Sequence, residues 1–290
     1  MKSGKEEKHQ TPAAGQTIRQ GSRVRMGLVI FLAISLLALS APFAPAGSPG
    51  QATVQKEAIL EEARTLMDRD QAGQKNRPQT ITTLEAYTAQ FPEEIRFPLY
   101  LAEAYYRLAD PNGDVHREFP NYEKADLYAQ RVLKLDPDRA EGHYWHGLFL
   151  LKKAQKRGGI SAYFIVKDGI KELEKVRQTL PGYDHAGASR VLGLLYCLAP
   201  GWSPFGDLNK SIELGKEAAR LAPNYILNRV YLAEAYQKQG DQEGAVQEYR
   251  AVLTLAAKLP PAQAEGFGQK ARRELRSLGQ ATVAEGSQVD

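Results

Sequence analysis

The stretch Leu-Ala-Glu-Ala-Tyr occurs twice in this 290-residue chain, at Leu101–Tyr105 and again at Leu232–Tyr236. The two copies begin 131 positions apart. Prolines near the ends of apolar runs divide the chain at intervals of 45, 44, 42 and 37 residues, at Pro92, Pro137, Pro181, Pro223 and Pro260. The first and fourth of these prolines are also 131 residues apart, so the two pentapeptides occupy one position in repeats that lie three units apart. Self-similarity at this period predicts a stack of supersecondary units.

Each unit has the pattern of two helices. Beyond residue 50 apolar residues recur at helical spacing, and little in the sequence favours strands. The first helix carries a leucine, a small residue and then an aromatic, and the second helix carries a small residue of its own before a proline ends it. Small residues allow two helices to pack closely. The small positions of the first helices are Ala102, Gly147, Gly193 and Ala233, and those of the second are Ala125, Ser211 and Ala245, with Ile170 in the second unit.

The unit at residues 231–255, YLAEAYQKQGDQEGAVQEYRAVLTL, resembles the tetratricopeptide repeat, with Tyr236 and Ala245 nine positions apart. The other units have longer spacings. Over roughly residues 95–260 the chain resembles the periplasmic T-component family of TRAP transporters. The stretches that carry this resemblance are the unit above, SAYFIVKDGIKELEKV at 161–176 and YDHAGASRVLGLLYCLAPGWSPFGDLNKSIELGKEAARLAPNY at 183–225. The resemblance implies a non-enzymatic accessory that associates with a solute-binding component and encloses a channel or pocket among its helices. Members are often lipoproteins, but residues 40–55 contain no cysteine.

We therefore predict an all-α fold of helical-hairpin repeats, a TPR-like superhelix or solenoid of about 11 helices, after an N-terminal signal or anchor segment. The repeat domain is expected at residues 52–260. Residues 261–278 have the polar pattern of a capping helix, which a solenoid needs to cover its open end. Residues 279–290 are expected to be a disordered tail.

Residues 1–46 are predicted to direct the chain to a membrane. The first 25 residues hold six basic and two acidic side chains, and the apolar run Met26–Ala41 follows with 16 residues. A spanning helix needs about 20 residues, so a secretory signal cleaved after Ala46 is our first interpretation and an uncleaved anchor is the alternative. The protein is expected to be periplasmic or exported, or anchored to the cytoplasmic membrane with membrane contact through residues 26–46.

The charge of the chain and the motifs it lacks exclude several classes of function. From residue 26 onward 32 basic residues balance 32 acidic ones, so the body has no electrostatic footprint for nucleic acid. Hydrolase and nucleotide-binding motifs are absent from the sequence, and no cofactor, no metal and no enzymatic activity are expected. We predict an exported scaffold or accessory protein that binds a protein partner, with a transporter solute-binding component as one candidate, or a small apolar or acidic ligand.

The alternative function is a metal-dependent enzyme or ligand-binding protein centred on His143 and His146. These histidines lie three positions apart and share a helix face. A catalytic zinc site would need a third ligand, for which Glu141 and His185 are candidates without a recognised spacing. The repeat explains His146 more simply, because His146 stands at the position where the first helices of the other units carry a leucine.

Three lengthened connections are the candidate binding edge. They span residues 108–122, 156–168 and 198–208 and fall at the same point of their repeats, so they are expected on one edge of the stack. One hypothesis is that their aromatic residues line a site for a ligand or partner, and the other is that they pack the loops onto the helices. The residues are Phe119, Tyr122, Tyr163, Phe164, Trp202 and Phe205.

Overall fold

A computed structural model describes residues 49–71, 77–109 and 113–279. The predictions for the leader and apolar run at residues 1–46, and for residues 280–290 of the tail, lie outside this part of the chain. The chain divides into two units, Met1–Gln55 and Lys56–Asp290, and the description below concerns the second. In the described ranges no helix is both long and apolar enough to cross a membrane.

The predicted all-α fold is confirmed. The described ranges contain eleven helices and no strand. In chain order they are α2 (Pro49–Gln71), α3 (Arg77–Gln90), α4 (Arg96–Leu108), α5 (Val115–Leu135), α6 (Ala140–Arg157), α7 (Gly159–Thr179), α8 (Tyr183–Leu198), α9 (Leu208–Leu221), α10 (Ile226–Gln239), α11 (Gln242–Ala256) and α12 (Pro261–Ser277).

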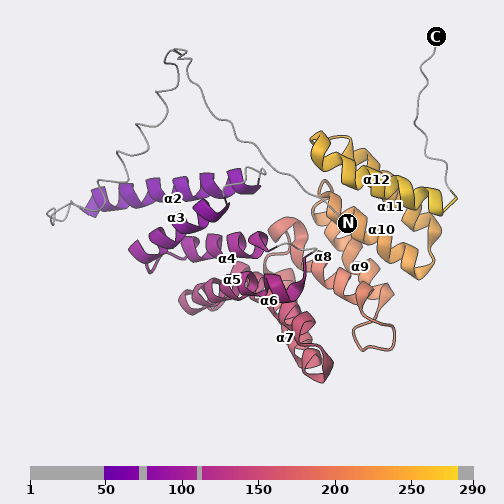
Figure 1. Cartoon of the computed structure of the whole chain (residues 1–290), viewed down its shortest axis with the longest axis horizontal. Coiled ribbons are helices and arrows are strands. Elements are labelled where there is room, and N and C mark those ends of the chain that lie inside the picture. The colour runs from indigo at the N-terminus through magenta and orange to yellow at the C-terminus, as the bar shows by residue number, and fades with distance from the viewer. Residues whose placement is uncertain (1–48, 72–76, 110–112, 280–290) are drawn as a thin grey trace, which may run out of the picture. The chain divides into compact units, whose positions relative to one another are not determined.

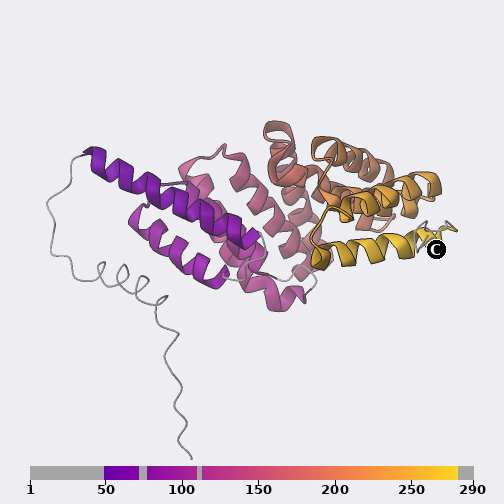
Figure 2. The ribbon, with the colours of Figure 1, turned by 90° about the horizontal axis from the view of Figure 1, so that it is seen from above.

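The helices pair as hairpins that follow one another in chain order (Figures 1 and 2). Each of the pairs α4–α5, α6–α7, α8–α9 and α10–α11 packs together and against its neighbours in sequence, α5 packs on α6 as extensively as on α4, and α12 packs on α11. First helices of successive hairpins also touch, as α4 does with α6 and α8 with α10. Five clusters of buried side chains follow the stack, and all of them lie after Lys56. The second unit therefore has its own core and meets the criterion for a domain that folds alone.

The punctuating prolines mark helix ends as the sequence predicted. α3, α5, α7 and α9 each end two residues before a proline, and Pro260 directly precedes α12. Proline removes a backbone donor and clashes with the preceding turn, so it stops the second helix of each hairpin.

The small column lies at the helix contacts. A Cβ added to Gly193 would stand 3.2 Å from the carbonyl oxygen of Ser211 on α9. In the second unit the close approach involves Gly169 rather than the predicted Ile170, because a Cβ on Gly169 would stand 3.3 Å from the carbonyl oxygen of Gly147. The contact position is therefore shifted by one residue, and Ile170 instead packs at the edge of the core.

The prediction of lengthened connections is wrong for 156–168 and holds only in part for 108–122, where 109–114 separate α4 from α5. α5 begins at Val115 and α7 at Gly159, so most of residues 108–122 and 156–168 extends the second helix of its hairpin. Gly158 and Gly159, each with φ of 63°, make the whole turn between α6 and α7, because glycine adopts this left-handed region without a Cβ penalty. The third segment stays mainly a loop, at 199–207, and in the described part of the first segment Ala109, Gly113 and Asp114 also lie outside the helices.

Candidate functional site

A pocket of about 550 Å³ opens between α4, α6, α8 and the start of α10. Aromatic rings make up much of its wall, and three arginines share it with one carboxylate. The rings belong to Tyr106, Tyr122, Tyr144, Trp145 and Tyr225. The charged residues are Arg77, Arg107, Arg190 and Asp184, and we call this the Asp184 pocket.

The backbone is left-handed where α8 begins. Asp184, His185 and Ala186 have φ values of 47°, 56° and 61°, and no other non-glycine residue in the described ranges has a positive φ. Such a conformation costs an L-residue about 1–2 kcal/mol, because Cβ comes too close to the following carbonyl oxygen. Strain of this kind persists where surrounding contacts enforce it, and it often occurs at functional sites.

Two buried side chains hold this left-handed turn. Arg190 donates from Nη1 to the carbonyl oxygens of Asp184 at 2.9 Å and of His185 at 3.0 Å. Asn228 on α10 donates from Nδ2 to the His185 carbonyl at 3.1 Å and to that of Ala218 on α9 at 2.9 Å. Hydrogen bonds to a charged group contribute about 1.5–3 kcal/mol each, the same order as the strain. The turn therefore depends on a contact from Asn228 on α10 as well as on Arg190 of α8, and α9 helps to position Asn228.

The Asp184 carboxylate joins three elements. Arg190 donates from Nη2 to Oδ2 at 2.7 Å, Arg107 on α4 donates to Oδ1 at 3.0 Å, and Tyr144 on α6 donates its hydroxyl to Oδ2 at 2.5 Å. Burial raises the pKa of Tyr144 well above its usual value, and the charge of Asp184 acts in the same direction, so the hydroxyl stays protonated. Burial opposes the charge of Arg190, but the charge of the Asp184 carboxylate and the hydrogen bond to it favour the charged form, and the pKa of the guanidinium is raised.

The aromatic wall is fixed by contacts among the rings. Tyr144 packs edge-on against Trp145 and Tyr183, with centroids 5.0 Å and 5.2 Å apart. The Trp145 indole donates to the Tyr183 hydroxyl at 3.1 Å, and Tyr106 lies against Trp145 at 5.5 Å. Aromatic pairs in these arrangements gain about 0.5–1.5 kcal/mol beyond the area they bury. The wall is thus preformed, so a ligand would not have to order it.

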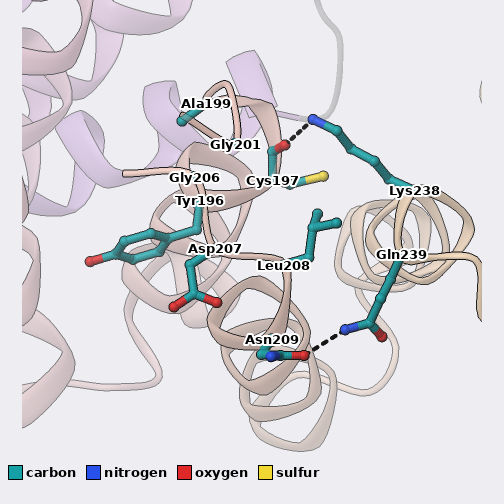
Figure 3. Close-up of a pocket in the computed structure, with 10 residues that line it drawn as sticks. All are labelled: Tyr196, Cys197, Ala199, Gly201, Gly206, Asp207, Leu208, Asn209, Lys238 and Gln239. Carbon is teal, nitrogen blue, oxygen red and sulfur yellow. Dashed lines mark hydrogen bonds between the residues drawn. The ribbon is translucent and has the colours of Figure 1, made fainter. Parts of the chain in front are cut away.

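A second pocket, of about 370 Å³, lies beside the loop at 199–207 (Figure 3). Lys238 at the end of α10 donates to the Cys197 carbonyl oxygen at 2.5 Å, and Gln239 donates to the Asn209 side chain at 2.6 Å, as the dashed lines show. Burial raises the pKa of the Cys197 thiol, which disfavours the reactive thiolate. These polar groups bond to one another and connect α8, α9 and α10, so the Asp184 pocket is the stronger candidate site.

The structure separates the six predicted aromatic residues. Phe119 and Tyr122 are buried on α5, where Phe119 packs against Phe149 at 5.8 Å. Tyr122 packs against Tyr106 at 5.1 Å, and through this contact it belongs to the wall of the Asp184 pocket.

The other four lie at the surface of the second and third hairpins. Tyr163 on α7 contacts both Phe164, at 5.2 Å, and Phe205 from the loop at 199–207, at 5.3 Å. Phe164 is 61% exposed and Trp202 is 88% exposed. The six residues therefore do not form one lining, and a binding role for them stays a prediction.

The two histidines of the alternative function face different helices. His143 Nδ1 lies 2.5 Å from Glu172 on α7, and His146 Nδ1 lies 2.6 Å from Asp126 on α5. Of the candidate third ligands, Glu141 pairs with an arginine at 2.8 Å. His185 stacks on a tyrosine ring at 4.3 Å. Across the described residues no three His, Cys, Asp or Glu side chains are grouped as a metal site.

Sequence reasoning missed the residues that build the Asp184 pocket. Asp184, Arg190 and Arg107 belong to no motif, and none of them stands at a position that recurs in the repeat. The available signal was Gly187, where a Cβ would stand 2.3 Å from the Tyr144 hydroxyl oxygen and would force that side chain to move. A glycine that follows an aspartate by three residues is too common to identify a site.

Comparison with solved structures shows the same fold. A thermophilic TPR protein from Thermus thermophilus matches with a TM-score of 0.57 and 17% identity, over 74% of this chain and 98% of that one. PilW, a widely conserved type IV pilus biogenesis factor, matches with a TM-score of 0.51 and 15% identity, over 76% of this chain and 93% of that one. No protein-family model and no curated protein matches the sequence. At these identities the likeness shows a TPR-like helical-repeat fold.

Proposed function

We propose that this protein is a non-enzymatic interaction scaffold whose Asp184 pocket receives an apolar or aromatic side chain from an extended segment of a protein partner. The observation that carries the proposal is the left-handed turn of three non-glycine residues held at the pocket wall by two buried side chains. A stack of hairpins needs no such turn for its own packing, whereas a preorganised binding site benefits from one.

The chemistry of the wall favours this kind of ligand. Fixed aromatic rings supply apolar contact area at little entropic cost. Arg107 is about one-third exposed and donates to Glu103 and Asp184. A guanidinium carries five N–H groups, so Arg107 also has donors for backbone carbonyl oxygens of a bound segment. Main-chain contacts would hold the segment, and the pocket would select the anchoring side chain.

A solute-binding component of a transporter is the partner that the resemblance to the TRAP T-component family implies, and we include it in the proposal. Export from the cytoplasm, or attachment to its membrane through residues 26–46, is the location that such a partner requires. Mass measurement of the mature chain tests this location, since cleavage after Ala46 gives an N-terminus at Gly47.

Peptide selection tests the pocket directly. Residues 49–290 are immobilised, and random peptides displayed on phage are selected for binding. We expect enrichment of sequences with a large apolar or aromatic residue. Leu227→Trp, which fills the pocket from α10, should abolish binding, whereas Leu198→Trp, at an exposed position away from the pocket, should retain it. Failure to enrich any motif, or equal binding by both variants, would contradict the proposal.

A pull-down from membranes with residues 49–290 as bait tests the partner. Recovery of a solute-binding protein by the unmodified chain and by Leu198→Trp, but not by Leu227→Trp, would support the transporter link. If Leu227→Trp recovers the solute-binding protein as well as the unmodified chain does, the Asp184 pocket does not bind that partner.

A further inference from the structure

The turn between α6 and α7 stands clear of the core. None of residues 155–168 is buried, while Ala154 and Gly169 on either side are. A Cβ on Gly158 or Gly159 would meet no atom within 4 Å. In Figure 1 one end of α7 extends away from the neighbouring helices. We call residues 155–168 the α6–α7 tip.

The α6–α7 tip carries large apolar side chains in solvent. Ile160 is 85% exposed, and Phe164 and Tyr163 stand beside it on the same face of α7 at i+4 and i+3. Phe205 packs on Tyr163, so the loop that carries the exposed Trp202 lies against the tip. The mostly apolar stretch from position 160 to 166 is about 10 Å long as a helix. Apolar groups gathered in this way contribute little to folding and mark a contact surface.

Positive charge surrounds this apolar surface. Residues 149–171 contain one acidic residue, Asp168, against six basic ones, a net charge of +5. Residues 26–290 are neutral overall, so the residues of 26–290 that lie outside 149–171 carry a net charge of −5. The lysine ammonium groups stay close to aromatic rings, with Lys156 3.7 Å from the Phe119 centroid and Lys167 5.7 Å from that of Tyr163. The basic residues are Lys152, Lys153, Lys156, Arg157, Lys167 and Lys171.

We propose that the α6–α7 tip, together with Trp202, binds the surface of an anionic lipid bilayer. A helix end with Phe, Tyr and Ile on one side and lysine and arginine around them matches an interfacial segment, whose apolar face enters about 5–10 Å into the headgroup region. Tryptophan and tyrosine concentrate at this depth of a membrane. A second copy of the chain is a poorer occupant, because its tip carries the same charge. The surface is separate from the Asp184 pocket, so this contact goes beyond the proposed function.

Tryptophan fluorescence provides the readout. The chain has two tryptophans, and Trp145 is buried while Trp202 is exposed. Residues 49–290, which omit the apolar run Met26–Ala41, are mixed with vesicles of phosphatidylcholine alone or with roughly equal phosphatidylglycerol. We expect a blue shift and co-sedimentation with the anionic vesicles only, both weakened by salt. The variant Trp202→Phe should lose the shift.

Matched variants separate charge from apolar contact. Removing two basic residues with Lys156→Ala and Arg157→Ala should weaken binding roughly 30-fold, at about 1 kcal/mol for each charge near the surface. Lys134→Ala with Lys258→Ala removes the same charge from exposed positions outside the tip and should leave binding within about threefold. Phe164→Ser should weaken binding about tenfold, and Leu127→Ser, at a leucine on α5 that is 64% exposed, should not.

Circular dichroism should show all of these variants folded, since each changed side chain lies at the surface. Equal binding to both kinds of vesicle, or equal binding by tip and control variants, would overturn the proposal. So would a dimer in sedimentation that Phe164→Ser dissociates, because the tip would then be a surface for self-association.

Discussion

Gly187 shows how one absent Cβ supports the Asp184 pocket. The Tyr144 hydroxyl occupies the space that a side chain at this position would fill, and from there it reaches the Asp184 carboxylate. The conformational freedom of glycine is not needed here, because Gly187 lies after the left-handed residues. What matters is the close approach of the Tyr144 side chain to the backbone of α8, and the addition of a single methyl group tests it.

Gly187→Ala should lower the free energy of unfolding by about 1–3 kcal/mol through overpacking. Urea unfolding measures the change. Tyr144→Phe in the same chain removes the nearest atom and should recover part of the loss, so the two substitutions should be non-additive. Gly266→Ala on α12 is the control, because a Cβ there meets nothing within 4 Å. That variant should gain roughly 0.5–1 kcal/mol. A stabilising Gly187→Ala would show that the approach is not tight.

His146 should make stability depend on pH. Burial disfavours its charged form, but the hydrogen bond and the charge of Asp126 outweigh burial and raise the pKa of His146 above its usual 6.5. A raised folded-state pKa stabilises the fold below the unfolded value, and that contribution disappears as pH rises through the folded value. The unfolding free energy of the unmodified chain should therefore exceed that of His146→Gln by more at about pH 5 than at about pH 8. A constant difference across this window would show that the pair does not titrate as described.

At the scale of elements, the start of α8 departs most from regular geometry. A regular helix from Gly182 onward would place Asp184 and His185 differently, and the hydrogen bonds from Arg190 and Asn228 favour the left-handed alternative. The element is therefore shaped by residues that lie up to 43 positions away in the chain, the separation between Asn228 and His185.

Ala186→Gly should relieve strain in this element. Glycine removes the left-handed penalty of about 1–2 kcal/mol, which offsets the loss of the buried methyl group. Ala188→Gly, in the regular part of α8, loses a similar methyl group and adds a backbone entropy cost of about 0.5–1 kcal/mol. Both variants share the entropy cost of glycine in the unfolded chain, so we expect Ala186→Gly to be about 1–2 kcal/mol less destabilising than Ala188→Gly in denaturant unfolding. Equal costs would indicate that residue 186 is not left-handed in solution.

At the scale of the whole molecule, hairpins pack mainly against their neighbours in the stack, and the Arg107–Asp184 ion pair links the first hairpin to the third. Stability in such an arrangement is a sum of units and of the interfaces between them. Leu275 on α12 lies in the cluster at the C-terminal end of the stack, and Leu173 on α7 lies in the central cluster. Truncating each leucine to alanine should therefore destabilise a different number of neighbouring helices.

Leu275→Ala and Leu173→Ala should each cost about 2–5 kcal/mol locally, because both leucines are buried. Hydrogen exchange measured by mass spectrometry distinguishes their reach. Leu275→Ala should speed exchange in α11 and α12 and leave α6 to α8 protected, whereas Leu173→Ala should speed exchange on both sides of α7. Uniform acceleration in both variants would show that the second unit unfolds as a single cooperative block.

The sequence by itself determined the repeat, the helical hairpins, their order and the places where prolines end them, because these depend on local spacing and on the small residues at each crossing. The tertiary structure decided that Phe119 and Tyr122 are buried and that Phe164 is exposed, because helices replaced two of the expected connections. It also decided that Trp202 is exposed on the loop that remained. It alone revealed the Asp184 pocket. Asp184 meets Arg107 across 77 positions and Tyr144 across 40, and no period in the sequence relates these residues. Hydrogen bonds and ion pairs form wherever stacking brings suitable groups together, so they cannot be read from the periodicity that produces the stack.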